Sequence, residues 1–220
     1  MTGQITKEDF VRMIAAAAAS IRGQHSMLSE LDCATGDGDH GTTMLRVVDR
    51  LEKAFSSGGP EDLKTCLQEA GWSVMGVDGG ASSSLLGVFF GGMADAPRYG
   101  GPTDTSDLAA MFEAGLAALR KQTKAQPGDK TMMDAIVPAI AAMRAAAEAG
   151  KSVSEALHDA SAAAKAGAEA TRNFTARHGR AKFLGEKTRG HPDPGATSMS
   201  LMFAGFCSAF EESKGEPGNA

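Results

Sequence analysis

Apolar residues recur every three to four positions along most of the chain, and strand-like alternation is almost absent. This spacing is typical of amphipathic helices, so the pattern predicts an all-α fold. We divide it into eight predicted helices, at about residues 6–31, 44–55, 60–74, 82–94, 104–119, 133–150, 152–173 and 197–210. Gly23 is expected to bend or interrupt the first helix, and Pro138 to kink the sixth or delay its start. Neither a repeat nor a linker is visible, so residues 1–220 are expected to form a single domain.

Capping residues support these boundaries. Thr6, followed three residues later by Asp9, resembles a capping box at the start of the first helix. Pro60 suits the first turn of the third helix, where its missing N–H costs nothing. Either Ser152 or Ser154 can cap the seventh helix.

The connections between the predicted helices alternate in character. Those after the first, third, fifth and seventh helices are rich in glycine, aspartate and other unusual residues. Those after the second, fourth and sixth are plain polar turns, at Ser56–Pro60, Pro97–Pro102 and Gly150–Lys151. Short connections favour antiparallel neighbours. In an up-and-down arrangement the four unusual loops then share one end, where we expect a binding site.

Composition narrows the class of protein. Hydrophobic residues make up 42% and charged residues 22%, ordinary values for a soluble globular chain. The net charge of -5 gives no basic surface for nucleic acid. The three cysteines lack any CxxC spacing and are typical of reduced thiols. The N-terminus lacks a signal-peptide pattern, and the longest apolar run, Ile14–Ala19, is too short to span a bilayer. We therefore expect a cytoplasmic protein that binds neither nucleic acid nor membrane.

The first unusual loop carries three carboxylates. Asp32, Asp37 and Asp39 alternate here with glycines at positions 36, 38 and 41. Glycine lets the backbone turn sharply, so oxygens from one short segment can converge. Carboxylates brought together repel one another unless a cation lies between them. Mg²⁺ prefers oxygen ligands and often also holds phosphates. The alternative is a solvated turn that caps the next helix, but three aspartates among three glycines favour a metal site.

The other three loops offer groups suited to a phosphate or a base. Residues 78–84 (DGGASSS) place glycines and serines at a helix start, which suits an anion or a simple helix cap. Residues 128–134 (GDKTMMD) contain Lys130, which could neutralise phosphate, and two methionines that could contact a base or fill the core. Residues 179–195 form an unusually long loop, in which Arg180 is the best candidate for a phosphate contact.

Two sequence matches to nucleotide-binding motifs do not indicate the folds in which those motifs usually occur. Residues 36–41 satisfy the dinucleotide pattern GxGxxG, but no strand precedes them and the intervening aspartates would repel a pyrophosphate. Gly150-Lys151-Ser152 resembles the end of a P-loop, but position 145 is alanine where the first glycine belongs.

Together the four loops resemble the nucleotide-binding L subunit of dihydroxyacetone kinases. The resemblance rests on four motifs, which occur in order across nearly the whole chain: DxxxxDGDHG from Asp32, GGAS from Gly79, GDKTM from Gly128, and GRA, LGE and GHxDPG between Gly179 and Gly195. It implies a single-domain antiparallel up-and-down barrel of about eight helices, with the nucleotide at one rim.

The resemblance also implies roles for individual residues. Asp32, Asp37 and Asp39 would bind two Mg²⁺ ions that bridge the nucleotide phosphates. His40, Gly41, Thr43, Ala81 and Ser82 would contact those phosphates. Met132 would lie against the adenine, and Arg180, Asp193 and Gly195 would close the nucleotide pocket.

The implied activity is that of a kinase subunit. In the family, a separate K subunit holds the triose, and the L subunit presents the phosphoryl group to it. Two phosphoryl sources stay open. Either ATP exchanges freely, or tightly held ADP is recharged by a phosphotransferase-system M subunit. The acceptor is dihydroxyacetone or a related ketose such as erythrulose. No catalytic nucleophile is expected, because phosphoryl transfer depends mainly on positioning and charge neutralisation.

The chain departs from the family pattern in its phosphate loops. It has Ser83-Ser84 where the family usually has Gly-Pro, Thr43 where asparagine is common, and Phe183 where tyrosine is frequent. These departures leave nucleotide preference and substrate open. One alternative function is a nucleotide-sensing adaptor that transfers no phosphoryl group. Another is an Mg-dependent all-α diphosphate lyase, which would need a second acidic motif where we see only isolated aspartates.

Overall fold

The computed structural model describes residues 5–56, 63–96 and 104–211. The described residues form eight α-helices and two short 3₁₀ helices, and no strand. They are α1 (Lys7–Thr35), α2 (His40–Ser56), α3 (Leu63–Met75), α4 (Gly80–Met93), α5 (Thr105–Gln122), α6 (Met133–Glu148), α7 (Val153–Ala170), η1 (Thr171–Asn173), η2 (Ala181–Thr188) and α8 (Pro194–Glu211). The predicted all-α fold is confirmed.

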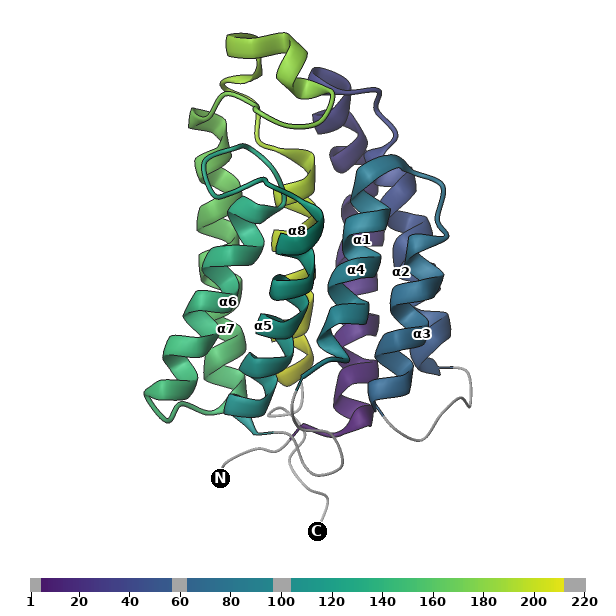
Figure 1. Ribbon diagram of the computed structural model, residues 1–220, viewed down its shortest axis with the longest axis vertical. Helices are drawn as coiled ribbons and strands as arrows, with labels where there is room; N and C mark the ends of the chain where they lie inside the picture. Colours follow the sequence, from purple (N-terminus) through teal and green to yellow (C-terminus); the bar gives the residue numbers. More distant parts are fainter. Residues whose placement is uncertain (1–4, 57–62, 97–103, 212–220) are drawn as a thin grey trace.

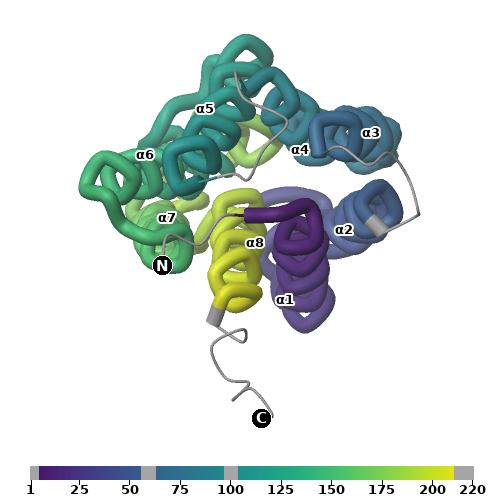
Figure 2. Tube along the Cα trace, turned by 90° about the horizontal axis from the view of Figure 1, so that it is seen from below, coloured from purple at the N-terminus to yellow at the C-terminus, as the bar shows by residue number. Residues whose placement is uncertain are grey.

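The eight α-helices close into a barrel. Each helix packs against the next along the chain, and α8 returns to pack against α1, so that the end view shows a ring (Figure 2). Successive helices run in opposite directions (Figure 1). The expected antiparallel up-and-down barrel is therefore confirmed.

Aromatic side chains fill part of the barrel interior. The Phe112 ring on α5 lies 6.0 Å from Phe89 on α4 and 5.8 Å from Phe203 on α8, measured between ring centroids. Phe206 also reaches Phe112, at 6.0 Å. All four rings are almost completely buried. They link three helices through one apolar core, and polar chemistry is left to the barrel ends.

Small residues let two pairs of helices approach closely. At Gly71 on α3, an added Cβ atom would lie 2.7 Å from the backbone of Gly91 on α4. The backbone of Ala17 on α1 similarly leaves no room for a side chain at Gly205 on α8. Interiors are close-packed, so these positions fix the spacing of α3 from α4 and of α1 from α8.

The predicted capping residues are largely confirmed. Thr6 and Asp9 form a capping box at the start of α1, and Ser152, rather than Ser154, caps α7. The expected interruption of the first helix at Gly23 is wrong, because α1 runs unbroken from Lys7 to Thr35. A single exposed glycine costs less than about 1 kcal/mol in a helix, and α1 is held on both sides by α2 and α8. Pro60 lies outside the described residues.

The other helix boundaries agree with the prediction only in part. The sixth helix does not start late, because α6 begins at Met133 and contains Pro138. The last turn of α1 includes Asp32, which was expected in the loop. The segment 174–196, expected to be a loop throughout, contains η2, and α8 already begins at Pro194.

The four unusual connections lie at one end of the barrel, as predicted. Residues 36–39, 76–79, 123–132 and 174–193 are all at the top in Figure 1. The turn after α6 is at the opposite end. The predicted turn at Pro97–Pro102 and most of the one at Ser56–Pro60 fall outside the described residues. Among the helices of the described part, none combines the length and the apolar character needed to cross a membrane.

Candidate metal centre and adjoining loops

Three carboxylates converge where α1 ends and α2 begins. Asp32 belongs to the last turn of α1, and Asp37 and Asp39 lie in the connection that follows. One oxygen from each carboxylate lies within 4.8 Å of the other two. Asp37 and Asp39 are exposed, and Asp32 is partly buried. Like charges this close are unfavourable without a cation between them. The all-carboxylate donor set suits a hard divalent ion such as Mg²⁺.

Glycines shape this connection. Gly38 has a φ of +79°, a left-handed conformation that glycine adopts without strain. A Cβ atom there would also lie 2.5 Å from the sulfur of Cys33. The Asp32 carboxylate accepts the backbone N–H of His40 at 3.2 Å. The connection is thus tight enough to turn both following aspartates back toward Asp32.

The first residues of α2 are tied to α1 and α8. Gly41 packs directly on the His25 carbonyl of α1. The buried His40 imidazole places Nε2 at 3.0 Å from the Ser198 hydroxyl, which donates to the Gly195 carbonyl at 2.9 Å. Burial lowers the pKa of His40, against the opposing charge of Asp32. His40 therefore links α2 to the start of α8.

Arg180 crosses to the carboxylates from the fourth loop. Its guanidinium forms an ion pair with Asp37, and both side chains are exposed. The contact joins two loops that are far apart in the sequence. It also places a permanent positive charge beside the three aspartates. A phosphate group could replace the Asp37 carboxylate as the partner of this guanidinium.

The second loop lies against the first. Gly79 contacts the side chain of the buried Thr43, and Gly80 has a left-handed φ of +74°. Ala81 is exposed and Ser82 is partly exposed, in the first turn of α4. The residue before the helix is Gly79, which provides no side-chain cap. The N–H groups of a first helical turn lack partners within the helix, so this turn offers donors to an anion.

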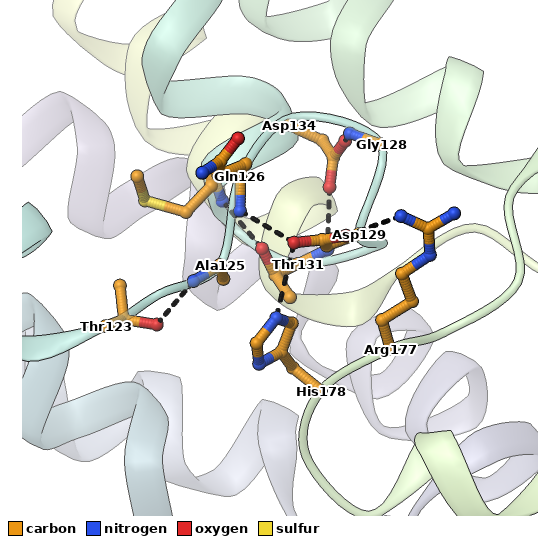
Figure 3. Close-up of polar contacts among 10 residues, drawn as sticks. Thr123, Ala125, Gln126, Gly128, Asp129, Thr131, Asp134, Arg177 and His178 are labelled. Atoms are coloured by element: carbon orange, nitrogen blue, oxygen red, sulfur yellow. Dashed lines mark hydrogen bonds and ion pairs between the residues drawn. The ribbon is translucent and has the colours of Figure 1, made fainter.

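The third loop is folded around one buried carboxylate. Asp134 accepts the backbone N–H groups of Gly128 at 2.5 Å and Thr131 at 2.7 Å (Figure 3). Burial raises the pKa of Asp134, partly offset by these N–H groups. The turn leads to Met132, which is buried just before α6.

Asp129 connects the third loop to the fourth. Its carboxylate lies 3.2 Å from Nε2 of His178 and 3.4 Å from Nη1 of Arg177 (Figure 3). It also accepts the backbone N–H of Gln126 at 2.9 Å. Although burial opposes the charged form, these partners lower the pKa of Asp129. The fourth loop is thereby fixed to the third at two residues that closely precede Arg180.

Lys130 binds backbone carbonyl groups in the structure, although its sequence motif suggested that it could neutralise a phosphate. The residue is buried and has a left-handed φ of +62°. Its ammonium donates to the carbonyls of Thr171, at 2.6 Å, and His191. Lys130 therefore ties the third loop to both ends of the fourth.

Met132, Asp193 and Gly195 meet at the start of α8. A Cβ atom at Gly195 would lie 3.5 Å from the Met132 backbone nitrogen and 3.1 Å from the Asp193 carboxylate. The same carboxylate accepts the Ala196 N–H at 2.7 Å, which caps α8. Burial raises the pKa of Asp193 to about 7, and the N–H of Ala196 opposes that rise.

The sequence analysis did not single out some residues that form contacts at this end of the barrel. Thr131-Met132-Met133-Asp134 fits the capping pattern T-x-x-D, so the position of Asp134 could have been found. Ser198 and Arg46 carry no such signal. Their partners His40 and Asp78 are 158 and 32 residues away in the chain, a separation that no local pattern reports.

The fold and these loops define an all-α antiparallel barrel with a carboxylate cluster at one rim. The model of the DAK2 domain family matches residues 34–208, and the chain belongs to that family.

Relatives and solved structures agree with this assignment. The chain is 37% identical over 177 residues to the "PEP-dependent dihydroxyacetone kinase 1, ADP-binding subunit DhaL" of Listeria innocua, covering 80% of this chain and 83% of the relative. It is 33% identical over 185 residues to the corresponding ADP-binding subunit DhaL of Escherichia coli, covering 84% and 88%. The dihydroxyacetone kinase of C. freundii has the same fold, with a TM-score of 0.73 and 24% identity over 95% of this chain. This chain spans 36% of that kinase.

Proposed function

We propose that residues 1–220 form one nucleotide-binding domain that acts as the Mg-nucleotide subunit of a dihydroxyacetone-type kinase. It would present the phosphoryl group to dihydroxyacetone or a related ketose held by a separate K subunit. The observation that carries the proposal is the cluster of Asp32, Asp37 and Asp39, whose oxygens lie within 4.8 Å of one another at a rim shared with three further loops. Relatives named as ADP-binding kinase subunits support it.

Each of the four loops would contribute its own contacts to the nucleotide. The three aspartates would hold Mg²⁺, with two ions as the proposed number, and bound Mg²⁺ would neutralise and orient the phosphates. The start of α2 and the first turn of α4 would surround those phosphates through His40, Gly41, Thr43, Ala81 and Ser82. Met132 would support the base, and Arg180, Asp193 and Gly195 would close the site. Arg180 would exchange its Asp37 partner for phosphate oxygens.

This division of labour needs no nucleophile in the chain. Phosphoryl transfer depends on alignment and on neutralising charge, and the acceptor hydroxyl comes with the K subunit. The phosphoryl source is either exchangeable ATP or ADP recharged by a phosphotransferase-system M subunit. The cytoplasmic location expected from the sequence belongs to the same proposal.

A reconstituted assay tests the function. The chain is mixed with a K subunit and either ATP or phosphotransferase components, and phosphorylation of dihydroxyacetone and erythrulose is measured. The proposal predicts product that depends on this chain, on the K subunit and on Mg²⁺. Turnover with ATP alone would identify ATP as the donor. Tight nucleotide binding without transfer in any combination would contradict the kinase function and favour a nucleotide-sensing adaptor.

The diphosphate-lyase alternative has little support. Such an enzyme would need a second acidic metal motif facing the first. In the described parts of the chain, the aspartate cluster at the end of α1 is the one group of three metal-ligating side chains that converge. Asp129 and Asp134 instead accept hydrogen bonds from their own loop.

A further inference from the structure

The loop between α3 and α4 is held by hydrogen bonds to its carbonyl groups. The hydroxyl of Ser83 donates to the Val77 carbonyl at 2.9 Å and also lies 3.3 Å from the Gly80 carbonyl. Arg46, on α2, donates from Nη1 to the Asp78 carbonyl at 3.1 Å. Ser83 is completely buried, whereas Arg46 is exposed. Two consecutive peptide groups are thus fixed from two different helices.

Fixing these carbonyls also fixes the neighbouring N–H groups. In a trans peptide the C=O and the following N–H point in opposite directions. The bonds to Val77 and Asp78 therefore orient the N–H groups of Asp78 and Gly79, away from Ser83 and Arg46 respectively. These two N–H groups directly precede the first turn of α4, which has no side-chain cap.

The loop is also fixed laterally. Gly79 contacts the side chain of Thr43, which in turn lies one turn before Arg46 on α2. The backbone N–H of Thr43 donates to the Asp39 carbonyl at 2.9 Å. A continuous set of contacts therefore runs from the aspartate loop through Thr43 to the loop that Arg46 and Ser83 hold.

We propose that Ser83 and Arg46 are positioning residues for the nucleotide phosphates: by holding the Val77 and Asp78 carbonyls, they keep the N–H groups of Asp78 and Gly79, just before α4, turned toward the phosphate chain. This inference rests on the proposed function, because it assumes a nucleotide at this rim. It assigns a use to Ser83, whose hydroxyl the family pattern does not supply at this position. It also gives Arg46 an effect on phosphate binding that does not require contact with the nucleotide.

Matched variants separate this effect from simple loss of charge. Arg46 and Arg50 line the same surface groove, of about 550 Å³, one helical turn apart. Arg46→Met removes the bond to Asp78 and one charge, whereas Arg50→Met removes the same charge next to it. Arg46→Lys keeps the charge and a donor. Ser83→Ala removes only the buried hydroxyl.

The measurement is calorimetric binding of Mg²⁺-ADP and of adenosine to each variant. We expect Arg46→Met and Ser83→Ala each to weaken Mg²⁺-ADP binding by about fivefold, the fold-change of roughly one hydrogen bond. Arg50→Met should stay close to wild type, and Arg46→Lys should recover part of the loss. Adenosine, which has no phosphate, should bind all variants equally. A merely structural role would weaken adenosine and ADP binding together and would lower the melting temperature.

The outcomes distinguish this inference from the function on which it rests. If the wild type does not bind Mg²⁺-ADP, the proposed function fails. If the wild type binds but Arg46→Met equals Arg50→Met, and Ser83→Ala equals wild type, the positioning role alone is overturned. An equal loss for ADP and adenosine would likewise overturn it.

Discussion

The side-chain nitrogen of Lys130 lies 2.6 Å from the carbonyl oxygen of Thr171, which is 41 residues further along the chain. The same ammonium donates to the His191 carbonyl. Burial lowers the pKa of Lys130, and the nearby carboxylates of Asp193 and Asp134 oppose that shift. One buried cation thus holds together the two loops that contribute Met132 and Asp193.

Replacing Lys130 should destabilise the rim. Lys130→Met leaves both carbonyls without their charged donor, and hydrogen bonds to charged groups are worth about 1.5–3 kcal/mol each. We expect the free energy of unfolding, measured in urea, to fall by about 2–3 kcal/mol. Lys124→Met, at an exposed lysine of the same segment, is the control and should change it by less than about 0.5 kcal/mol. Equal effects of the two substitutions would refute the structural role of Lys130.

Two glycine-to-alanine substitutions should change the free energy of unfolding in opposite directions. At Gly71 the new methyl group would lie 2.7 Å from the backbone of Gly91, so α3 and α4 must separate. We expect Gly71→Ala to lower the free energy of unfolding by about 1–3 kcal/mol. At Gly23 no atom lies within 4 Å of the new methyl group. There alanine should raise stability by about 0.5–1 kcal/mol, because the site is in the middle of α1. Equal shifts in thermal unfolding would contradict this packing.

The stability of the protein should depend on pH through Asp193. Burial raises the pKa of this carboxyl group to about 7 from its ordinary 3.8. The charges of Asp134 and Asp32 favour the protonated form, and that of Lys130 opposes it. Because the folded chain binds this proton more tightly than the unfolded chain, the contribution is full below about pH 4 and is lost as the pH rises through 7.

Asp193→Asn removes this dependence and keeps an oxygen that can accept the Ala196 N–H. In metal-free buffer we expect the variant to gain stability over wild type between about pH 5 and pH 8, by about 2 kcal/mol, since one pKa unit corresponds to about 1.4 kcal/mol. Urea unfolding at the two pH values measures the gain. Asp95→Asn, at an exposed aspartate, is the control for the loss of a surface carboxylate. A constant difference between Asp193→Asn and wild type would contradict the raised pKa.

The sequence was sufficient to predict the helices and their up-and-down arrangement, because helical periodicity and the alternating loops are local signals that add up along the chain. The closed barrel was implied only by the resemblance to a known family. Thr6, Asp104 and Ser152 begin their helices through side-chain caps, which sequence patterns report directly. The exception, Gly23, shows tertiary packing overriding a residue's own helix propensity.

Contacts between distant segments could not be predicted in the same way. The aspartates Asp37 and Asp39 were recognisable because they lie close together in the chain. That Arg180 pairs with Asp37, and that Lys130 holds backbone carbonyls, follows only from the way the barrel brings the first, third and fourth loops together at one rim. Long side chains reach any of several partners, and the tertiary fold decides which.

The most direct test of the account is calorimetric binding of ADP to wild type and Asp37→Asn, with and without Mg²⁺. The control is Asp95→Asn, at an exposed residue just after α4. The C-terminal end of α4 lies at the opposite end of the barrel from the four loops (Figure 1). With Mg²⁺ the account predicts that Asp37→Asn weakens binding by at least about tenfold, because a metal ligand is lost. With a chelator in place of Mg²⁺, Asp37→Asn should bind ADP more tightly than wild type does. The substitution removes a negative charge that repels phosphate, and it frees Arg180 from its ion pair. Equal Mg²⁺-dependent binding by wild type and Asp37→Asn would contradict the metal site and, with it, the proposed function.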